Sequence, residues 1–122
     1  MLTVYWNSGA QRPGTLWLAM LEQFTLDTFT PLTGQVFTIY VDGMAPLKAV
    51  LESVNEIPVS GWRPGEAAEH RKPFSLLFLG PPRVVLPQAI YRFEHEAIGA
   101  FEIFIVPIGR TAEGVRYEVV FS

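Results

Sequence analysis

The chain has 122 residues, of which 49% are apolar and 17% charged, and its formal net charge is −3. This length fits one domain with a single modest core, and an acidic balance with nine scattered Lys and Arg argues against binding to nucleic acid, which needs a basic face. The absence of Cys excludes disulfides, thiol catalysis and thiolate metal sites, and apolar runs such as Ile103 to Ile108 are too short to span a bilayer.

We expect no secretory signal in the first part of the chain, because polar residues and Gly interrupt its apolar residues. A second Met, Met20, precedes the first regular pattern. We expect residues 1–19 to be a start-site extension or a loose arm, and residues 20–122 to form a single β domain. The rival interpretation is an additional edge strand from Leu2 to Trp6. Without a signal or a membrane-spanning segment, the expected location is the cytoplasm.

A short helix and a strand are the first predicted elements. Thr25 can cap a helical segment in "TLDTFTPLTG", which ends before Gly34 and which Pro31 limits to about two turns. The run "QVFTIYV" (35–41) predicts a strand, and the Asp42-Gly43 pair predicts the turn that follows it.

The middle of the chain predicts two strands separated by a long polar loop. In "PLKAVLESVNEI" (46–57), Val50 and Val54 have helical spacing but also fit a strand, which the preceding turn and the β-rich neighbours favour. Residues 58–73 are polar and predict a loop. "FSLLFL" (74–79) is apolar on both faces, so it predicts a strand that is central or covered.

The last third of the chain predicts one loop and three strands. "GPPRVVLPQ" (80–88) cannot be ordinary central sheet, because its three Pro lack a backbone donor. "AIYRFEH", "AFEIFIV" and "VRYEVVF" each predict a strand. About six short strands with one short helical turn near the N-terminus predict an all-β fold, either a small antiparallel barrel or a compact sandwich.

The triplet Glu94-His95-Glu96 resembles a reactive site but has the wrong geometry for one. Successive side chains of a strand point to opposite faces, so the two carboxylates leave from the face opposite to His95 and do not converge on the imidazole. His95 is in phase with Tyr91 and Phe93, which predicts that it faces the core and bonds a loop carbonyl. A role in a site is the less favoured alternative.

Two pairings of the hairpin around this triplet remain open. In one, residues 96–98 form the loop and Arg92 lies beside Glu102. In the other, residues 97–99 form the loop and Gly99 takes the left-handed position of a three-residue turn. We favour the second pairing, because an exposed ion pair contributes only about 0–1 kcal/mol.

No pattern in the sequence supports catalysis or a bound cofactor. His70 and Glu66 could share one helical surface, but two ligands make a weak metal site. The serines have no nucleophile-elbow context, and the glycines lack the spacing of a phosphate-binding loop. We therefore expect no catalytic residue, no metal and no cofactor.

Two surfaces are candidates for binding. The first is a protein-contact surface on the two long loops, rich in the aromatic and arginine side chains favoured at interfaces; it consists of Trp62, Arg63, Arg71 and Arg83. An alternative for Trp62 is to cover the end of the barrel. The second is a small-molecule pocket near Gln88, Tyr91 and His95. A lipocalin-like internal cavity is not expected, since about eight strands are needed to enclose one.

Four segments resemble a known family: "FTLDTFTPLTGQVF", "FSLLFLGP", "LPQAIYRFEHEAIGAFEIFIVPIG" and "GVRYEVVF". From Phe24 to the C-terminus, the chain resembles an uncharacterised bacterial family of domains of unknown function. The resemblance implies a small β domain found in company with tail-collar and tail-fibre-like proteins of phage-type gene clusters, and it assigns no catalytic residue. We therefore expect a non-catalytic protein-interaction or structural accessory domain that binds a protein partner or a second copy, with a small-molecule-binding module as the alternative.

Overall fold

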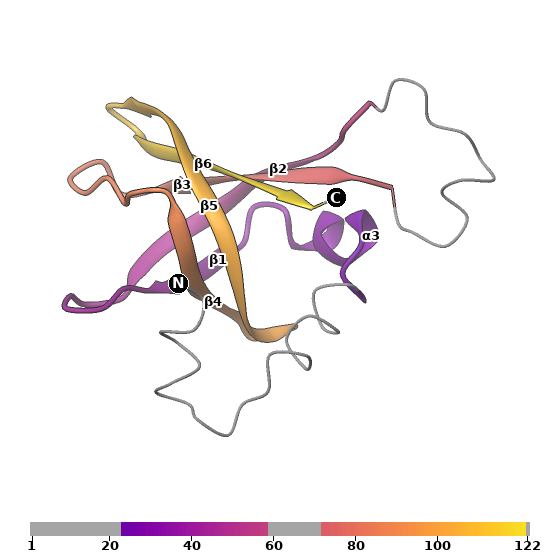
Figure 1. The fold of residues 1–122 in the computed structure, drawn as a ribbon, viewed down its shortest axis with the longest axis horizontal. Coiled ribbons are helices and arrows are strands. Elements are labelled where there is room, and N and C mark those ends of the chain that lie inside the picture. The colour runs from indigo at the N-terminus through magenta and orange to yellow at the C-terminus, as the bar shows by residue number, and fades with distance from the viewer. Residues whose placement is uncertain (1–22, 59–71, 122) are drawn as a thin grey trace.

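Alternating apolar side chains close six antiparallel strands into a barrel in the computed structural model, which describes residues 23–58 and 72–121 (Figure 1). Around the barrel the strands follow the order β1-β2-β3-β6-β5-β4, and β4 pairs with β1. The predicted all-β class and short helical segment are confirmed, as a barrel rather than a sandwich. The elements are α3 (Leu26–Phe29), η1 (Thr30–Leu32), β1 (Val36–Tyr40), β2 (Leu47–Glu56), β3 (Phe74–Gly80), β4 (Ala89–His95), β5 (Gly99–Thr111) and β6 (Gly114–Phe121).

The helical segment forms where capping residues predict it. The backbone N–H of Thr25 donates to Thr28 Oγ1 at 2.9 Å, so the N-terminus of α3 is capped. Pro31 lies in the first turn of η1, where a missing N–H costs nothing. Gly34 follows the segment at φ +88°, a left-handed conformation that favours glycine. Within these described residues no helix has the length or apolar character needed to cross a membrane.

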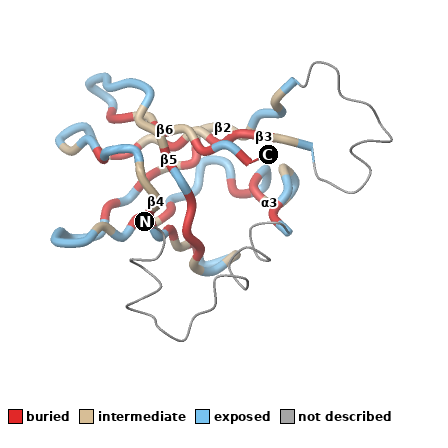
Figure 2. The backbone as a smooth tube through the Cα atoms, in the orientation of Figure 1, coloured by how far each residue is buried: buried red, intermediate tan, exposed pale blue. Residues whose placement is uncertain are grey.

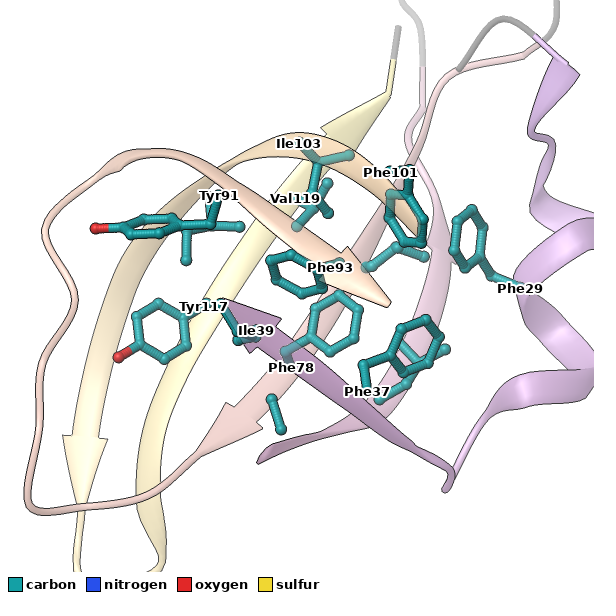
Figure 3. Close-up of a cluster of buried hydrophobic side chains, with 14 of the residues drawn as sticks. Phe29, Phe37, Ile39, Phe78, Tyr91, Phe93, Phe101, Ile103, Tyr117 and Val119 are labelled. Carbon is teal, nitrogen blue, oxygen red and sulfur yellow. The ribbon is translucent and has the colours of Figure 1, made fainter. Parts of the chain in front are cut away.

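Aromatic rings fill the barrel, and α3 closes one of its ends. Figure 2 shows buried positions along the strands and exposed positions at the turns. Phe29 of α3 is fully buried and packs at ring-centroid distances of 5.3 Å from Phe24 and 5.6 Å from Phe121. Figure 3 shows its ring beside Phe101. We call this end, which also carries the β4–β5 turn, the helix end, and the opposite end, with the β1–β2, β3–β4 and β5–β6 connections, the loop end.

The predicted proline-rich loop closes the loop end. Leu86 is only 2% exposed, and its backbone N–H donates to Tyr117 Oη at 2.9 Å. The hydroxyl of Tyr91 donates to the carbonyl of Pro87 at 2.7 Å. In Figure 3 both tyrosines lie on the side of the core away from Phe29. Hydrogen bonds to two tyrosines of the core therefore hold this loop in place.

The register of the β4–β5 hairpin differs from the favoured prediction. Residues 96–98 form the loop, and Arg92 lies directly across from Glu102, so the favoured pairing with a 97–99 loop is wrong. Gly99 pairs with His95 and still has φ +80°, so one register satisfies both the glycine and the charges. Glu102 is only 5% exposed, and another carboxylate opposite it would be costly away from water.

A β-bulge in β2 explains the helix-like spacing of its valines. The register with β3 shifts between Leu51 and Ser53. Before the shift Val50 faces outward, and after it Val54 packs against the core opposite Leu76. One extra residue thus reverses the alternation, and the predicted strand is confirmed.

Several predictions concern residues outside the described part of the chain. The interpretations of residues 1–19 as an arm and of Leu2 to Trp6 as an edge strand fall there, and so does most of the predicted 58–73 loop.

Candidate functional site

His95 lies at the end of β4, and both nitrogens of its ring are hydrogen-bonded. It is 6% exposed and packs against Phe37 in a tilted arrangement, with a ring-centroid distance of 4.6 Å. The backbone N–H of Ala97 donates to Nδ1 at 2.9 Å, and Nε2 lies 2.7 Å from Gln35 Oε1. Because a backbone N–H can only donate, Nδ1 is the acceptor, and the neutral ring carries its proton on Nε2. His95 faces inward as its phase predicts, but the predicted loop-carbonyl partner is wrong.

These two hydrogen bonds give His95 a structural role rather than a reactive one. A metal ligand or a general base needs a free ring nitrogen, and both are occupied. The carboxylate of Glu94 points elsewhere and accepts a hydrogen bond from the hydroxyl of Tyr40. Over residues 23–58 and 72–121, no group of three or more His, Asp or Glu is arranged to hold a metal ion.

A groove of about 590 Å³ lies on the outer face of β1 beside the β4–β5 turn. The register builds it, because Thr38 pairs with Lys48 on β2 and with Glu94 on β4. These three side chains form one row across three strands, pointing away from the core. The groove is lined by Gln35, Val36, Thr38, Lys48, Glu94, His95, Glu96 and Gly99.

The groove holds opposite charges that do not pair with each other. Lys48 Nζ donates to Thr38 Oγ1 at 2.9 Å, and the Tyr40 hydroxyl donates to Glu94 Oε1 at 2.5 Å. That bond to a carboxylate is the main reason why the pKa of Tyr40 is raised above its ordinary value of 10.0. The guanidinium of Arg92 lies over the Tyr40 ring, 5.4 Å from its centroid. Neither Lys48 nor Glu94 forms an ion pair with any described residue.

The structure does not gather the residues of the predicted pocket. Gln88 is exposed in the proline-rich loop, and Tyr91 is bonded to Pro87 at the loop end. His95 lies four residues further along β4, about 13 Å away at the rise of a strand, at the helix end. Of this set only His95 lines the groove.

The predicted protein-contact surface is mostly outside the described residues, which include Arg83 but not Trp62, Arg63 or Arg71. Arg83 is exposed at the loop end. The chain leaves β2 at Glu56 and enters β3 at Phe74, both at the helix end. The two long loops are therefore attached at opposite ends of β3, about 20 Å apart at the rise of a strand.

Sequence reasoning missed Gln35, Thr38 and Lys48. Gln35 and His95 are 60 residues apart in the chain and meet because β1 pairs with β4. No local pattern marks them. To find them, one would have to know that β1 pairs with β4, and this pairing exists only in the closed barrel.

A second feature, also missed, is an apolar area on the outer face of β5 and β6. Phe104 is 49% exposed, Ile108 53% and Val120 56%. Phe104 lies directly across from Ile90 of β4, which extends the apolar surface to a third strand. The signal was present, because the run Ile103 to Val106 is apolar at every position and so must place apolar side chains on both faces.

Comparisons with known proteins give one match. No curated protein and no solved structure matches the chain. The family described as "Domain of unknown function (DUF6916)" matches residues 24–121, which span the helical segment and all six strands. The chain therefore belongs to the DUF6916 family.

Proposed function

We propose that this domain is a non-catalytic protein-interaction or structural accessory module. The observation that carries the proposal is the outer face of β5 and β6, where Phe104, Ile108 and Val120 are each about half exposed. Contiguous exposed apolar side chains on a folded domain commonly mark a surface that another protein covers. Both ring nitrogens of His95 are hydrogen-bonded, so no reaction centre is assembled around it. This also favours a non-catalytic role.

The proposed partner is a component of a larger assembly or a second copy of the chain. The sequence resemblance implies company with tail-collar and tail-fibre-like proteins of phage-type gene clusters. We therefore propose a bacterial protein that acts in the cytoplasm, where a phage-tail-like particle is assembled. A closed barrel suits this role, because its paired strands hold the outer face rigid.

The face is a better contact surface than a strand edge. β5 pairs with β4 as far as Ile105 and with β6 from Val106 onward. Among the described strands, its last residues therefore pair only with β6, and their other edge is unpaired. Pro107 lies in this stretch, and the register shifts between Pro107 and Gly109. A proline and a bulge both discourage the addition of another strand.

The test replaces apolar residues of this face by polar ones. A Phe104→Ser, Val120→Thr double variant should lose self-association in sedimentation, or lose crosslinks to a partner from a photoreactive residue at position 108. A matched control is Val36→Thr, which changes a valine that is 51% exposed on β1. A wild-type protein that stays monomeric at all concentrations and forms no crosslink in its native host contradicts the proposal.

A second candidate function is the binding of a small molecule, and the groove beside His95 favours it. Its volume of about 590 Å³ falls within the range of ligand pockets. Its polar groups come from three strands and are held by hydrogen bonds. A panel of metabolites screened by NMR tests this candidate, and ligands that leave the resonances of the groove unchanged argue against it.

A further inference from the structure

We propose that the groove on β1 binds a short zwitterionic peptide, with the ligand's carboxylate at Lys48 and its ammonium group at Glu94. This inference rests on the small-molecule-binding function proposed above and names the class of ligand. It follows from the placement of two opposite charges on opposite sides of one open groove.

The first step is the placement of the two charged residues on the strands that flank β1. Lys48 and Glu94 pair with the same residue, Thr38, from the two strands that flank β1. Neighbouring strands are about 4.8 Å apart, so the Cα atoms of Lys48 and Glu94 are roughly 10 Å apart. Each side chain is held by a neutral hydroxyl, from Thr38 and Tyr40 respectively, rather than by the opposite charge.

The second step is the bonding capacity that remains. An ammonium group has three donors, and the bond to Thr38 uses one of Lys48's. A carboxylate has about four acceptor sites, and the bond from Tyr40 uses one of Glu94's. Because both side chains line the groove, their remaining donors and acceptors are available to a ligand there.

The third step is the neutral side-chain amide of Gln35, which can donate hydrogen bonds into the groove. His95 holds Gln35 Oε1, which fixes the side-chain amide and leaves its two N–H donors for the groove. A peptide unit in the ligand offers a carbonyl acceptor for such a donor. Val36, which is 51% exposed, adds an apolar surface for a ligand side chain.

The peptide unit distinguishes the proposed ligand from a free amino acid. A free amino acid carries both charges on one carbon and has no peptide carbonyl to accept a hydrogen bond from the Gln35 amide. A dipeptide adds one peptide unit, which separates its two Cα atoms by about 3.8 Å. Glu96 gives the groove a second carboxylate, so a ligand with a net charge of zero or above is favoured over an anion.

The experiment compares four probes by ¹H–¹⁵N NMR, following the amides of Thr38 and Gly99 and the side-chain amide of Gln35. The probes are dialanine, N-acetyl-dialanine, dialanine amide and alanine. Dialanine should shift these resonances in a saturable way. Loss of its ammonium or its carboxylate should weaken binding up to about fivefold each, the strength of an exposed ion pair, and alanine should bind more weakly than dialanine.

Two variants assign the charges to the two sides. Lys48→Met should bind dialanine and its amide equally, because the partner of the carboxylate is gone. Glu94→Gln should bind dialanine and its N-acetyl form equally. The matched controls Lys72→Met and Glu118→Gln change described residues that do not line the groove, and they should keep the wild-type order.

The outcomes separate the two proposals. Equal binding of charged and blocked probes to the wild type, or unchanged preferences in both groove variants, overturns the zwitterion assignment while a ligand site remains. If neither these probes nor a metabolite panel shifts the groove resonances, both the assignment and the small-molecule-binding function are wrong.

Discussion

Replacement of Phe29 by alanine tests whether α3 is part of the barrel core. The ring is fully buried and lies within 5.3 to 6.2 Å, between centroids, of Phe24, Phe121, Phe74 and Phe101. Truncation of a buried Phe to Ala costs about 3–5 kcal/mol, because contacts are lost and a cavity remains. A domain of this size has about 5–15 kcal/mol of total stability. The change should therefore remove a large part of it and lower Tm by about 15–30 °C.

The assay is thermal and urea unfolding followed by circular dichroism in the β-sheet band. Phe104→Ala is the matched control, because Phe104 is 49% exposed on the outer face and should cost about 1 kcal/mol or less. Phe29→Leu keeps most of the apolar volume, so it should fold and cost less than the alanine variant. Equal destabilisation by Phe29→Ala and Phe104→Ala would refute the conclusion that the helix closes the core.

Three further predictions concern the loop end, a tight turn and the histidine. Tyr117→Phe leaves a buried N–H without its acceptor and should cost about 1–3 kcal/mol at neutral pH. Burial raises the pKa of Tyr117 above 10.0, so the folded protein holds this proton more tightly than the unfolded chain. The free energy of unfolding of the wild type should therefore be full below pH 10 and fall above it. In thermal melts at alkaline pH, the stability of Tyr117→Phe should fall less than that of the wild type. In urea unfolding, Gly114→Ala should lower stability more than Gly43→Ala does. Both glycines have positive φ, but only at Gly114 would a Cβ collide with the carbonyl oxygen of Gly80. Equal losses of stability in the two variants would contradict this reasoning. Long-range ¹H–¹⁵N spectra of His95 should show the neutral ring with its proton on Nε2, and the opposite tautomer would contradict the assigned hydrogen bonds.

Local chemistry was enough to predict most of the elements. Thr25 and Pro31 mark a short helix, and Asp42-Gly43 marks a turn; these signals act over a few residues, and the structure contains both features. The apolar strand 74–79 was predicted to be central or covered for the same local reason, and β3 pairs with strands on both sides. Such features follow from propensity and alternation alone.

Register and strand order were harder to predict because they depend on distant residues. The preference for a 97–99 loop treated the charge on Glu102 as exposed, whereas the folded protein buries it. The bulge between Leu51 and Ser53 leaves no signal in the local sequence beyond an ambiguous valine spacing. The wrong register and the unforeseen bulge both show that one hairpin or one strand cannot be judged without its neighbours in the barrel.

The candidate site shows the same limit. His95 was identified as a core-facing residue from its phase, and the structure places it so. Its contact with Gln35 and the row formed by Lys48, Thr38 and Glu94 exist only after β1 has paired with strands on both sides. A site assembled across strands cannot be seen in any single stretch of sequence.

The pairing of β3 with β6 has a consequence for synthesis on the ribosome. Phe74, at the start of β3, pairs with Phe121, so one of the two neighbours of β3 is translated only after β4 and β5. Until β6 has emerged, the nascent chain therefore holds β3 with one edge available to β2 and the other edge unpaired. During that interval the chain depends on chaperones or on fast folding to avoid aggregation.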